Sequence, residues 1–330
     1  FGKSNRCSKW LCSKGFDPVD IASGKVLATR EDFTLPGPIP LIWERNYYSD
    51  SDYESTVGSR WSHTYDMYLQ LDVLQHIEED YQEDIPVIKL RMSDGRLTGF
   101  RRIEIGETEY DRQEKLELTR DEEGYLLRDA DRLHYRFHEG EEGKRWYIRS
   151  IQDTSGNSIQ FQYDEQNALQ KIIDSVGREL SIDTDAYNKI LAIHAPHPTT
   201  KGKTFPIARY EYDKAGDLVK STNALDHSYH YKYDNHLMVQ RTRPDGVSFY
   251  YQYDSEENNA RCIHTYGDGG LYKGNLHYEE GKTTIERIVA HPDGHTDTYT
   301  EIYYHDGAVV HRKTDALGNE TKYEYNDFYE

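Results

Sequence analysis

Two histidines of this chain have the spacing of metal ligands. His134 and His138 lie four positions apart, which would suit two zinc ligands on one face of a helix. They flank Tyr-Arg-Phe in a strand-like run, however, and four residues of a strand span about 13 Å. The His-Glu-x-x-His motif is absent, because His138-Glu139 is followed by Gly-Glu-Glu. We therefore predict that His134 and His138 do not share a metal ion.

Other residues capable of metal or nucleophilic chemistry are few. His194 and His197 belong to a His-Ala-Pro-His-Pro segment that we interpret as an irregular surface loop. The three cysteines Cys7, Cys12 and Cys262 are too few for a disulfide framework, which favours a reducing compartment of synthesis. A structural zinc site normally takes four ligands, and the spacing of these residues does not supply them.

Catalytic motifs are absent as well. Neither a Gly-x-Ser-x-Gly elbow nor a Walker-type phosphate loop occurs, and carboxylates are so abundant that no glycosidase-like pair stands out. We predict no catalytic residue, no cofactor and no metal, and hence no enzyme activity of this chain by itself.

Charge and hydropathy exclude two classes of partner. The chain has 40 basic and 59 acidic residues, a net charge of −19, which opposes binding to a phosphate backbone and so excludes nucleic acid. It contains no run of about 18 apolar residues, so we predict no membrane span, and its first residues lack the apolar stretch of a signal peptide. Because it starts at Phe1 instead of Met, we expect a fragment.

A tyrosine–aspartate pair recurs through the second half of the chain. The steps from Tyr212 to Tyr233 and from Tyr233 to Tyr253 are 21 and 20 residues, a period typical of stacked supersecondary units. Tyrosine supplies a large apolar body with a polar tip, and aspartate can bond the backbone of a turn, so we interpret the pairs as structural. The pairs are Tyr163-Asp164, Tyr212-Asp213, Tyr233-Asp234 and Tyr253-Asp254, with Tyr325-Asn326 as a variant.

Turn signals precede most of these pairs by seven residues. They contain the glycines that tight turns need, namely Gly156, Gly177, Gly246 and Gly318. Alternating runs such as Ser158–Tyr163 follow the turns, and alternation indicates strands. Each repeat is thus about two strands and two turns, and residues 125–330 are predicted to form an antiparallel β-sheet.

The N-terminal part is predicted to be β as well. We expect a flexible segment over residues 1–16 and a β region over residues 17–124, with a hairpin turn at Ser93–Arg96. A proline-rich stretch within it should stay extended and should not pair as a central strand, which suggests a rigid edge, plug or rim. Its residues are Pro36, Gly37, Pro38, Pro40 and Trp43.

Together, these motifs carry a resemblance. The Pro-Gly-Pro-x-Pro-Leu segment, the Gly58-Ser-Arg-Trp-Ser-His63 run and the Tyr-Asp repeats resemble the Rhs/YD-repeat family of polymorphic toxins, from about Asp17 to the end of the chain. The resemblance implies an all-β, spiralling sheet that is part of a hollow shell around a C-terminal toxin. It also implies a bacterial effector made in the cytoplasm and then secreted or injected into a competing cell, commonly by type VI secretion.

The partners implied by the resemblance are the remaining shell, the toxin domain, and a secretion spike or chaperone. A shell around a cargo of about 100 residues needs a wall roughly 140 Å around, whereas about 20 strands cover roughly 95 Å, so this chain would be one end of a larger cage. The alternative is a repeat module that binds carbohydrate or a cell-surface partner through exposed tyrosines.

Overall fold

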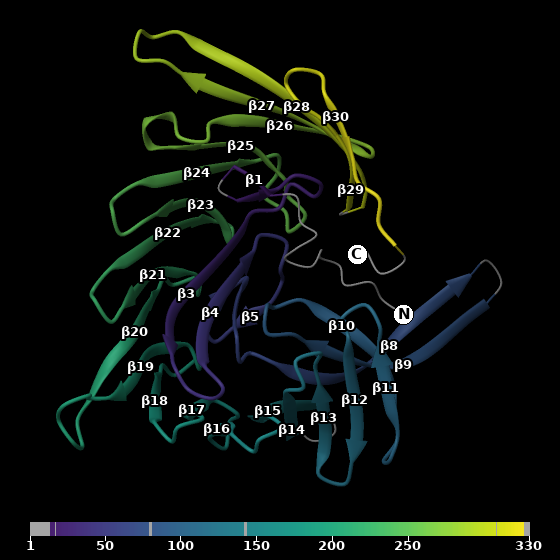
Figure 1. Ribbon diagram of the computed structural model, residues 1–330, viewed down its shortest axis with the longest axis vertical. Helices are drawn as coiled ribbons and strands as arrows, with labels where there is room; N and C mark the ends of the chain where they lie inside the picture. The colour runs from purple at the N-terminus through teal and green to yellow at the C-terminus, as the bar shows by residue number, and fades with distance from the viewer. Residues whose placement is uncertain (1–13, 17, 79–80, 142–143, 308, 327–330) are drawn as a thin grey trace. The chain divides into compact units, whose positions relative to one another are not determined.

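The fold is built almost entirely of β-strands. The computed structural model describes residues 14–16, 18–78, 81–141, 144–307 and 309–326, so Cys7, Cys12 and most of the predicted flexible segment 1–16 lie outside the described residues. In this described part the one helical element is a short 3-10 turn, and the predicted all-β class is confirmed (Figure 1). The elements are β1 (Lys14–Gly15), β2 (Val19–Asp20), β3 (Leu27–Leu35), β4 (Leu41–Tyr48), β5 (Glu54–Ser55), β6 (Gly58–Ser59), β7 (Trp61–His63), β8 (Tyr68–Glu78), β9 (Tyr81–Arg91), β10 (Leu97–Arg101), β11 (Thr108–Asp111), β12 (Leu116–Asp121), β13 (Gly124–Arg128), β14 (His134–Glu141), β15 (Arg145–Gln152), β16 (Ser158–Tyr163), β17 (Leu169–Ile173), β18 (Glu179–Thr184), β19 (Ile190–Pro196), β20 (Thr204–Tyr212), β21 (Leu218–Asn223), β22 (Ser228–Asp234), β23 (Leu237–Thr242), β24 (Ser248–Tyr253), β25 (Cys262–Gly267), η1 (Asp268–Gly270), β26 (Gly274–Glu279), β27 (Lys282–Ala290), β28 (Thr296–Asp306), β29 (Val309–Thr314) and β30 (Glu320–Lys322).

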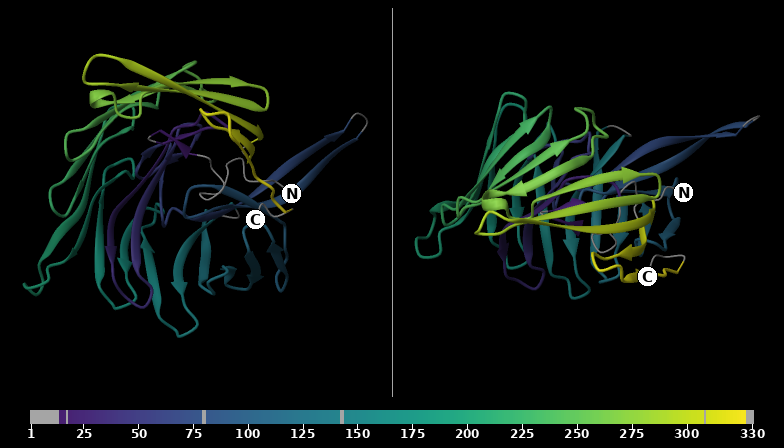
Figure 2. Two further views of the ribbon diagram at one scale, coloured as in Figure 1. Left: turned by 45° about the horizontal axis from the view of Figure 1, so that its top comes forward. Right: turned by 90° about the horizontal axis from the view of Figure 1, so that it is seen from above.

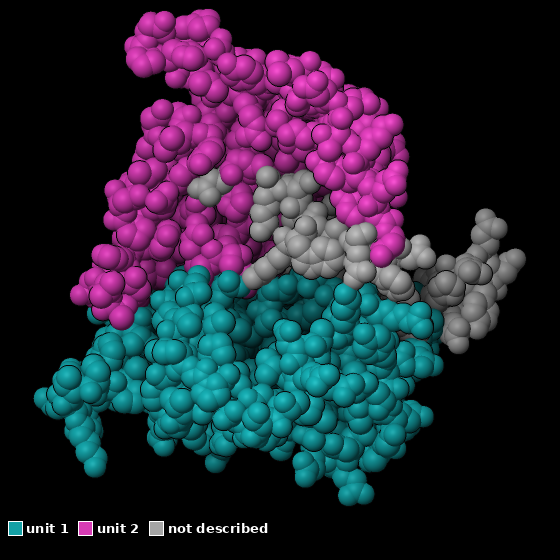
Figure 3. Space-filling view, viewed as in Figure 1, with its two compact units in different colours: residues 1–5, 31–45, 62–209 teal, residues 6–30, 46–61, 210–330 magenta. Residues whose placement is uncertain are grey.

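The chain divides into two compact units (Figure 3). Unit 1 contains residues 31–45 and 62–209, and unit 2 contains the described residues of 6–30, 46–61 and 210–330. The N-terminal segment therefore contributes to both units. Within each unit, successive strands of the large sheet pair antiparallel, and the sheet twists and curves as right-twisted strands require (Figure 2).

Alternating side chains decide which face of each repeat strand is buried. In β16, Ile159 and Phe161 are buried while Gln160 and Gln162 are exposed, and β18 repeats the pattern. Successive side chains of a strand point to opposite faces, so one face of the sheet is apolar and the other polar. Burial of the apolar face is the main source of stability.

The repeat tyrosines coincide with β-bulges. The register between paired strands shifts at Gln162/Tyr163, at Lys232/Tyr233 and at Gln252/Tyr253. Each shift leaves one residue of the following strand without a direct partner, which bends the pair and increases its twist. The bulges therefore recur with the repeat and add to the curvature of the sheet.

Strands β8 to β15 of unit 1 close into a ring. Strand β15 completes it, because Trp146 pairs with Leu69 of β8 while Ile151, farther along β15, pairs with Ile159 of β16. One edge of β15 thus pairs with two strands, with β8 along its N-terminal half and with β16 along its C-terminal half. The repeat sheet continues from β16. The core here includes Tyr125 and Phe137, which are direct cross-strand partners exposed by only 1% and 0%.

Two segments differ from the sequence-based expectation. Pro36 to Pro40 form a bend between β3 and β4, where an extended run was predicted. Trp43, which was predicted not to pair in a central strand, lies in β4, the central strand of the three-stranded sheet β3-β4-β7. His194 lies in strand β19, where an irregular loop was predicted, because burial of Ile193 and Ala195 continues the alternation. The predicted turn at Ser93–Arg96 is present between β9 and β10. Among the residues that the structure describes, no helical segment has the length and apolar composition of a membrane span.

Candidate functional site

Aspartates at the strand ends hold the repeat turns. Asp153 Oδ1 accepts hydrogen bonds from the backbone nitrogens of Ser155 and Asn157, each at 2.9 Å. Asp164 does the same for Gln166 and Ala168, at 2.9 Å each. A side-chain oxygen that satisfies two backbone donors favours a turn over a continued strand. Equivalent bonds are made by Asp174, Asp185, Asp213, Asn223 and Asp315.

The turn glycines have left-handed backbone angles. Gly156, Gly177, Gly246 and Gly318 have φ of 86°, 84°, 86° and 84°, values that side chains rarely tolerate. Asp234 departs from this pattern: it ends β22 and leads into the two-residue turn Asn235-His236, both at positive φ, 47° and 64°. Asn at positive φ is tolerated in such hairpin turns, so this repeat turns without an aspartate bridge. Asp254 Oδ1 accepts a hydrogen bond from the backbone nitrogen of Arg261 at 2.8 Å.

The repeat tyrosines of unit 2 form a ladder of hydroxyl-to-backbone hydrogen bonds. Tyr233 donates to the carbonyl of Leu218 at 3.0 Å, and Tyr253 donates to that of Met238 at 2.9 Å. Tyr325 donates to Val310 at 3.0 Å, again fifteen residues earlier in the chain. Burial raises the pKa of Tyr233 and Tyr253 well above the ordinary value, so both hydroxyls keep their proton and act as donors.

Tyr278 belongs to the same ladder, although no Tyr-Asp pair marks it. Its hydroxyl donates to the Cys262 carbonyl at 2.7 Å, and burial raises its pKa. The residue after it is Glu279, so a search for Tyr-Asp misses it. Its place at the end of an alternating strand, before an acidic residue and Gly281, was the available signal.

Two stretches of the N-terminal segment (residues 18–66), namely residues 18–30 and 46–61, belong to unit 2 and pack against this ladder. Tyr47 is fully buried; its hydroxyl donates to the His236 carbonyl at 3.0 Å and accepts from the Met238 nitrogen at 2.9 Å. Trp61 Nε1 donates to the Tyr233 hydroxyl at 2.9 Å. Tyr233 therefore bonds the N-terminal segment and the preceding repeat strand at once. Sequence reasoning did not assign Tyr47 or Trp61 to this role.

Two glycines allow close approach of the N-terminal segment to the repeats. Gly58 has φ of +112°, and a Cβ there would lie 3.1 Å from both Cβ and N of Leu218. Gly24 has φ of +74°, and a Cβ there would lie 2.7 Å from Arg261 Cβ. The Gly24 carbonyl accepts the Cys262 nitrogen at 2.8 Å. Thr56 adds a further contact, since its carbonyl accepts the Tyr212 hydroxyl at 3.3 Å.

In unit 1, the proline-rich bend contacts a repeat turn. Ser175 Oγ donates to the Ile39 carbonyl at 2.7 Å, and Arg178 Nη2 donates to the Pro36 carbonyl at 2.6 Å. A Cβ on Gly37 would lie 2.6 Å from Ser175 Oγ, so a larger residue there would displace this hydroxyl from the Ile39 carbonyl. Pro38 and Pro40 are exposed on this bend.

Aromatic rings continue the N-terminal core of unit 1. Trp43 is fully buried and stacks on His63, with centroids 4.3 Å apart and planes at 14°. Burial lowers the pKa of His63 to about 4, so the ring is neutral near pH 7. The Tyr65 ring lies 4.9 Å from Phe161 of β16. Tyr163, the repeat tyrosine of this unit, lies under the Arg149 guanidinium at 4.6 Å from the ring centroid.

The residues that could bind a metal ion or act as a nucleophile lie apart or are held in other contacts. No group of three His, Cys, Asp or Glu residues in the described ranges is placed to hold a metal ion. His134 and His138 both lie in strand β14, and His194 bonds Asp183 at 2.9 Å. His197 lies just after β19, with its Nδ1 3.3 Å from the Thr199 nitrogen. Burial raises the pKa of the Cys262 thiol to about 12, which disfavours a thiolate nucleophile.

Comparison with known proteins matches most of the chain. Residues 16–100 match a family described as a domain of unknown function, DUF6531, and residues 142–296 match the family described as Teneurin YD-shell. The chain is 24% identical over 290 residues to double-stranded DNA deaminase toxin A of Burkholderia cenocepacia, covering 85% of this chain and 19% of that protein. It is 25% identical over 314 residues to probable deoxyribonuclease RhsB of Dickeya dadantii, covering 94% of this chain and 20% of that one. It spans about a fifth of the length of these relatives. A structure of the Photorhabdus luminescens Tc holotoxin pore aligns with a TM-score of 0.38 at 13% identity, covering 94% of this chain and 16% of that one.

Proposed function

Because the chain belongs to the Rhs/YD-repeat family of polymorphic toxins, we propose that it is a wall segment of a shell that encloses a toxin domain located outside these 330 residues. The relatives carry deaminase and deoxyribonuclease names, and this chain spans about a fifth of their length. Toxin activity and any self-cleavage would then belong to other parts of the full protein, and the present chain would be a non-enzymatic scaffold.

The observation that carries this proposal is the seating of the N-terminal segment on the tyrosine ladder. A single repeat cannot bury its apolar face alone and depends on neighbours or a cap. Tyr47 and Trp61 are exposed by only 0% and 1%, and they occupy that role in unit 2. In unit 1, Trp43 is exposed by 0% and Ile39 by 6%. The segment thus stabilises the wall, which is the property that a container needs.

Delivery is the second part of the proposal. We place synthesis in the bacterial cytoplasm and release by a type VI secretion system into a competing cell, with a secretion spike or chaperone as partner. The support is the family, whose relatives include toxins. On this proposal the proline-rich bend, Pro36 to Pro40 with Trp43 behind it, lies at a rim or plug of the shell.

Encapsulation can be tested on the full gene product in its native producer. The protein is tagged, purified without denaturant, and every copurifying polypeptide is weighed by mass spectrometry. We expect a separate toxin polypeptide that resists protease and leaves only when denaturant is added. A chain that purifies alone, or a toxin that is digested as fast as in denaturant, contradicts the proposal.

Two variants make the test specific. Trp61→Ala removes a ladder contact and should expose the toxin to protease, whereas Tyr187→Ala removes a ring that is 86% exposed and should not. Delivery is tested separately by competition against a sensitive strain. Killing that persists without the type VI sheath would contradict the delivery route while leaving the shell intact as a proposal.

A further inference from the structure

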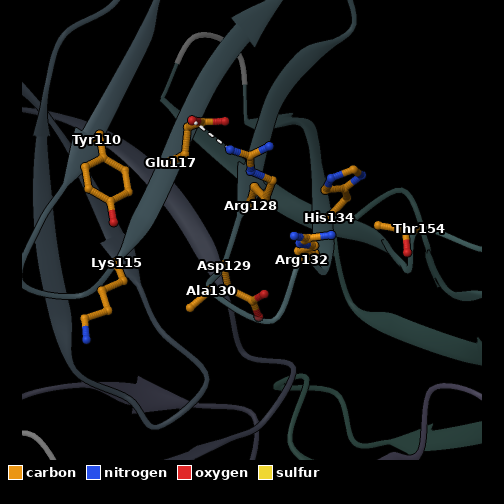
Figure 4. A pocket seen from close by; sticks show the side chains of 9 residues that line it. All are labelled: Tyr110, Lys115, Glu117, Arg128, Asp129, Ala130, Arg132, His134 and Thr154. Carbon is orange, nitrogen blue, oxygen red and sulfur yellow. Dashed lines mark hydrogen bonds and ion pairs between the residues drawn. The ribbon is translucent and has the colours of Figure 1, made fainter.

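A cavity of about 590 Å³ lies in unit 1, outside the tyrosine ladder (Figure 4). Its floor includes a row of direct cross-strand partners on β11 to β14, in which Tyr110 pairs with Glu117, Glu117 with Arg128, and Arg128 with His134. Neighbours in a strand point to opposite faces, so this row lies on the face away from the buried Leu116, Leu118 and Leu127. Its volume falls within the range of about 300–1,000 Å³ that is typical of small-ligand sites.

The cavity is lined mostly by residues with polar side chains, whose carbon atoms also form part of its surface. Of the residues that line it, only Ala130 lacks a polar side chain. Its acidic groups are already engaged: Glu117 accepts from Arg128 at 3.1 Å, and Asp129 accepts from the Leu133 nitrogen at 2.9 Å and the Tyr135 hydroxyl at 2.8 Å. The cavity suits a polar ligand.

Exposed cations stand at the rim. Lys115 and Arg132 are both exposed and come from the turns before β12 and before β14. The chain as a whole has a net charge of −19, so a cavity rimmed by cations departs from the average surface. It would attract an anion at short range.

The turn that carries Arg132 places this residue at a left-handed position. Its turn is closed by bonds from the Asp129 nitrogen to the Leu133 carbonyl at 3.2 Å and from the Arg132 nitrogen to the Asp129 carbonyl at 3.1 Å. The Asp164 turn has the same two bonds, and there Asn167 takes the left-handed position with φ of 61°. Arg132 holds that position with φ of 62°, where a residue other than Gly or Asn is disfavoured.

We propose that this cavity binds a carboxylate-bearing sugar of the uronic acid class. The Tyr110 ring, which is 53% exposed, offers a flat face for the sugar ring. Arg132 would form the paired, charge-assisted hydrogen bonds that a guanidinium makes with a carboxylate. His134 and the Thr154 hydroxyl on the far side would bond sugar hydroxyl groups, and the aromatic face favours a sugar over a bare anion (Figure 4).

The test uses the purified chain and D-glucuronate, followed by saturation-transfer NMR and titration. We expect saturable binding that glucose does not reproduce. Arg132→Asn should weaken it roughly tenfold or more, since a charge-assisted bond is lost. The same variant places at position 132 the residue that the Asp164 turn uses, so the melting temperature should stay the same or rise. Tyr110→Ala should also weaken binding, and Lys214→Asn, at an exposed cation of another turn, should not.

Three outcomes would overturn the inference. The first is the absence of saturable glucuronate binding, and the second is equal binding of glucose. The third is inorganic phosphate binding as tightly as glucuronate with no effect of Tyr110→Ala, which would show that charge alone is recognised. Because the melting temperature of Arg132→Asn is measured beside its affinity, loss of binding cannot be attributed to loss of the fold.

Discussion

Trp61 donates a hydrogen bond from Nε1 to the hydroxyl of Tyr233 at 2.9 Å, across 172 residues of sequence. The same hydroxyl donates to the Leu218 carbonyl at 3.0 Å, so a single buried oxygen joins the N-terminal segment to the repeat sheet. The Tyr47 ring packs beside both partners, with centroids 5.3 Å from Trp61 and 6.2 Å from Tyr233. The hydroxyl of Tyr233 therefore bonds both the preceding repeat strand and the N-terminal segment.

Tyr233→Phe should destabilise unit 2. The change leaves the buried Trp61 N–H and the Leu218 carbonyl each without this hydroxyl, and a buried polar group that loses its partner costs about 1–3 kcal/mol. Urea denaturation followed by far-UV circular dichroism measures the change in the free energy of unfolding.

The matched control is Tyr325→Phe. It removes the same kind of bond, to the Val310 carbonyl at 3.0 Å, from a ring that is 37% exposed, so water can replace the hydroxyl. Its cost should be below that of Tyr233→Phe. Equal costs would mean that the ladder bond matters by itself and that the contact with Trp61 adds nothing.

Asp174→Ala should loosen the turn between β17 and β18 and the proline-rich bend with it. Asp174 Oδ1 accepts the backbone nitrogens of Val176 and Arg178 at 3.0 and 2.9 Å, and the side chain is only 1% exposed. We expect a loss of about 1–3 kcal/mol of unfolding free energy. Urea denaturation followed by tryptophan fluorescence, to which the buried Trp43 and Trp146 of unit 1 contribute, measures the loss.

Asp174→Asn distinguishes the contribution of the backbone hydrogen bonds to Asp174 from that of its ion pair with Arg178. Its amide oxygen can still accept the two backbone nitrogens, so much of the stability should return, whereas the ion pair of Asp174 with Arg178 at 2.5 Å would be lost. If the Asn and Ala variants are equally unstable, the ion pair supplies the stability and the assigned role of the backbone bonds is wrong.

The local elements of this fold could be predicted because each depends on neighbours in sequence. Alternation in Ser158–Tyr163 predicts strand β16, and the Asp-Thr-Ser-Gly156 sequence predicts its preceding turn, since both follow from the backbone preferences of a few residues. The contact of Trp61 with Tyr233 could not be found in this way. Nothing local to either residue specifies a partner 172 positions away.

The same reasoning explains the proline-rich bend and the cavity. Pro36, Pro38 and Pro40 lack backbone N–H groups, so they predict that the segment does not pair in the middle of a β-sheet. Whether the segment extends or turns depends on Ser175 and Arg178, which donate hydrogen bonds to it from a distant repeat. Tyr110, Arg128 and His134 come together only through the register of four strands. Single-sequence periodicity does not determine register between strands.

His63 should make unit 1 sensitive to acid. Burial lowers its pKa from 6.5 to about 4 in the folded chain, so between these values the unfolded chain binds more protons, and stability falls as pH falls. The full contribution is present above about pH 6.5, and on the order of 3 kcal/mol is lost by about pH 4. Unfolding free energy measured by urea denaturation at several pH values tests this.

His63→Gln identifies the residue responsible. In the parent, His63 Nδ1 accepts a hydrogen bond from the Tyr65 backbone nitrogen at 3.2 Å, and the glutamine amide oxygen can accept the same bond. Because glutamine does not titrate, the variant should lose less stability than the parent on acidification. His197→Gln, at a half-buried histidine just after β19, should follow the parent curve. Parallel curves for His63→Gln and the parent would contradict a role for His63.

Cys262 offers a direct measurement of how firmly the N-terminal segment is seated in unit 2. The thiol is fully buried, its pKa is raised to about 12, and its backbone nitrogen donates to the Gly24 carbonyl at 2.8 Å. Maleimide should therefore label it slowly in a Cys7→Ser, Cys12→Ser background. Gly24→Ala should raise that rate by roughly tenfold or more, since the methyl group would lie 2.7 Å from Arg261 Cβ and the opening would become at least about 1.4 kcal/mol easier.

The control for Gly24→Ala is Gly246→Ala. Gly246 also has a left-handed backbone, with φ of +86°, but a Cβ there meets nothing within 4 Å, so this variant has the backbone strain without the clash. Its labelling rate should stay near that of the parent. Equal acceleration in both variants would mean that Cys262 reports general loosening of the repeats, whereas acceleration by Gly24→Ala alone would assign the protection to the seated N-terminal segment.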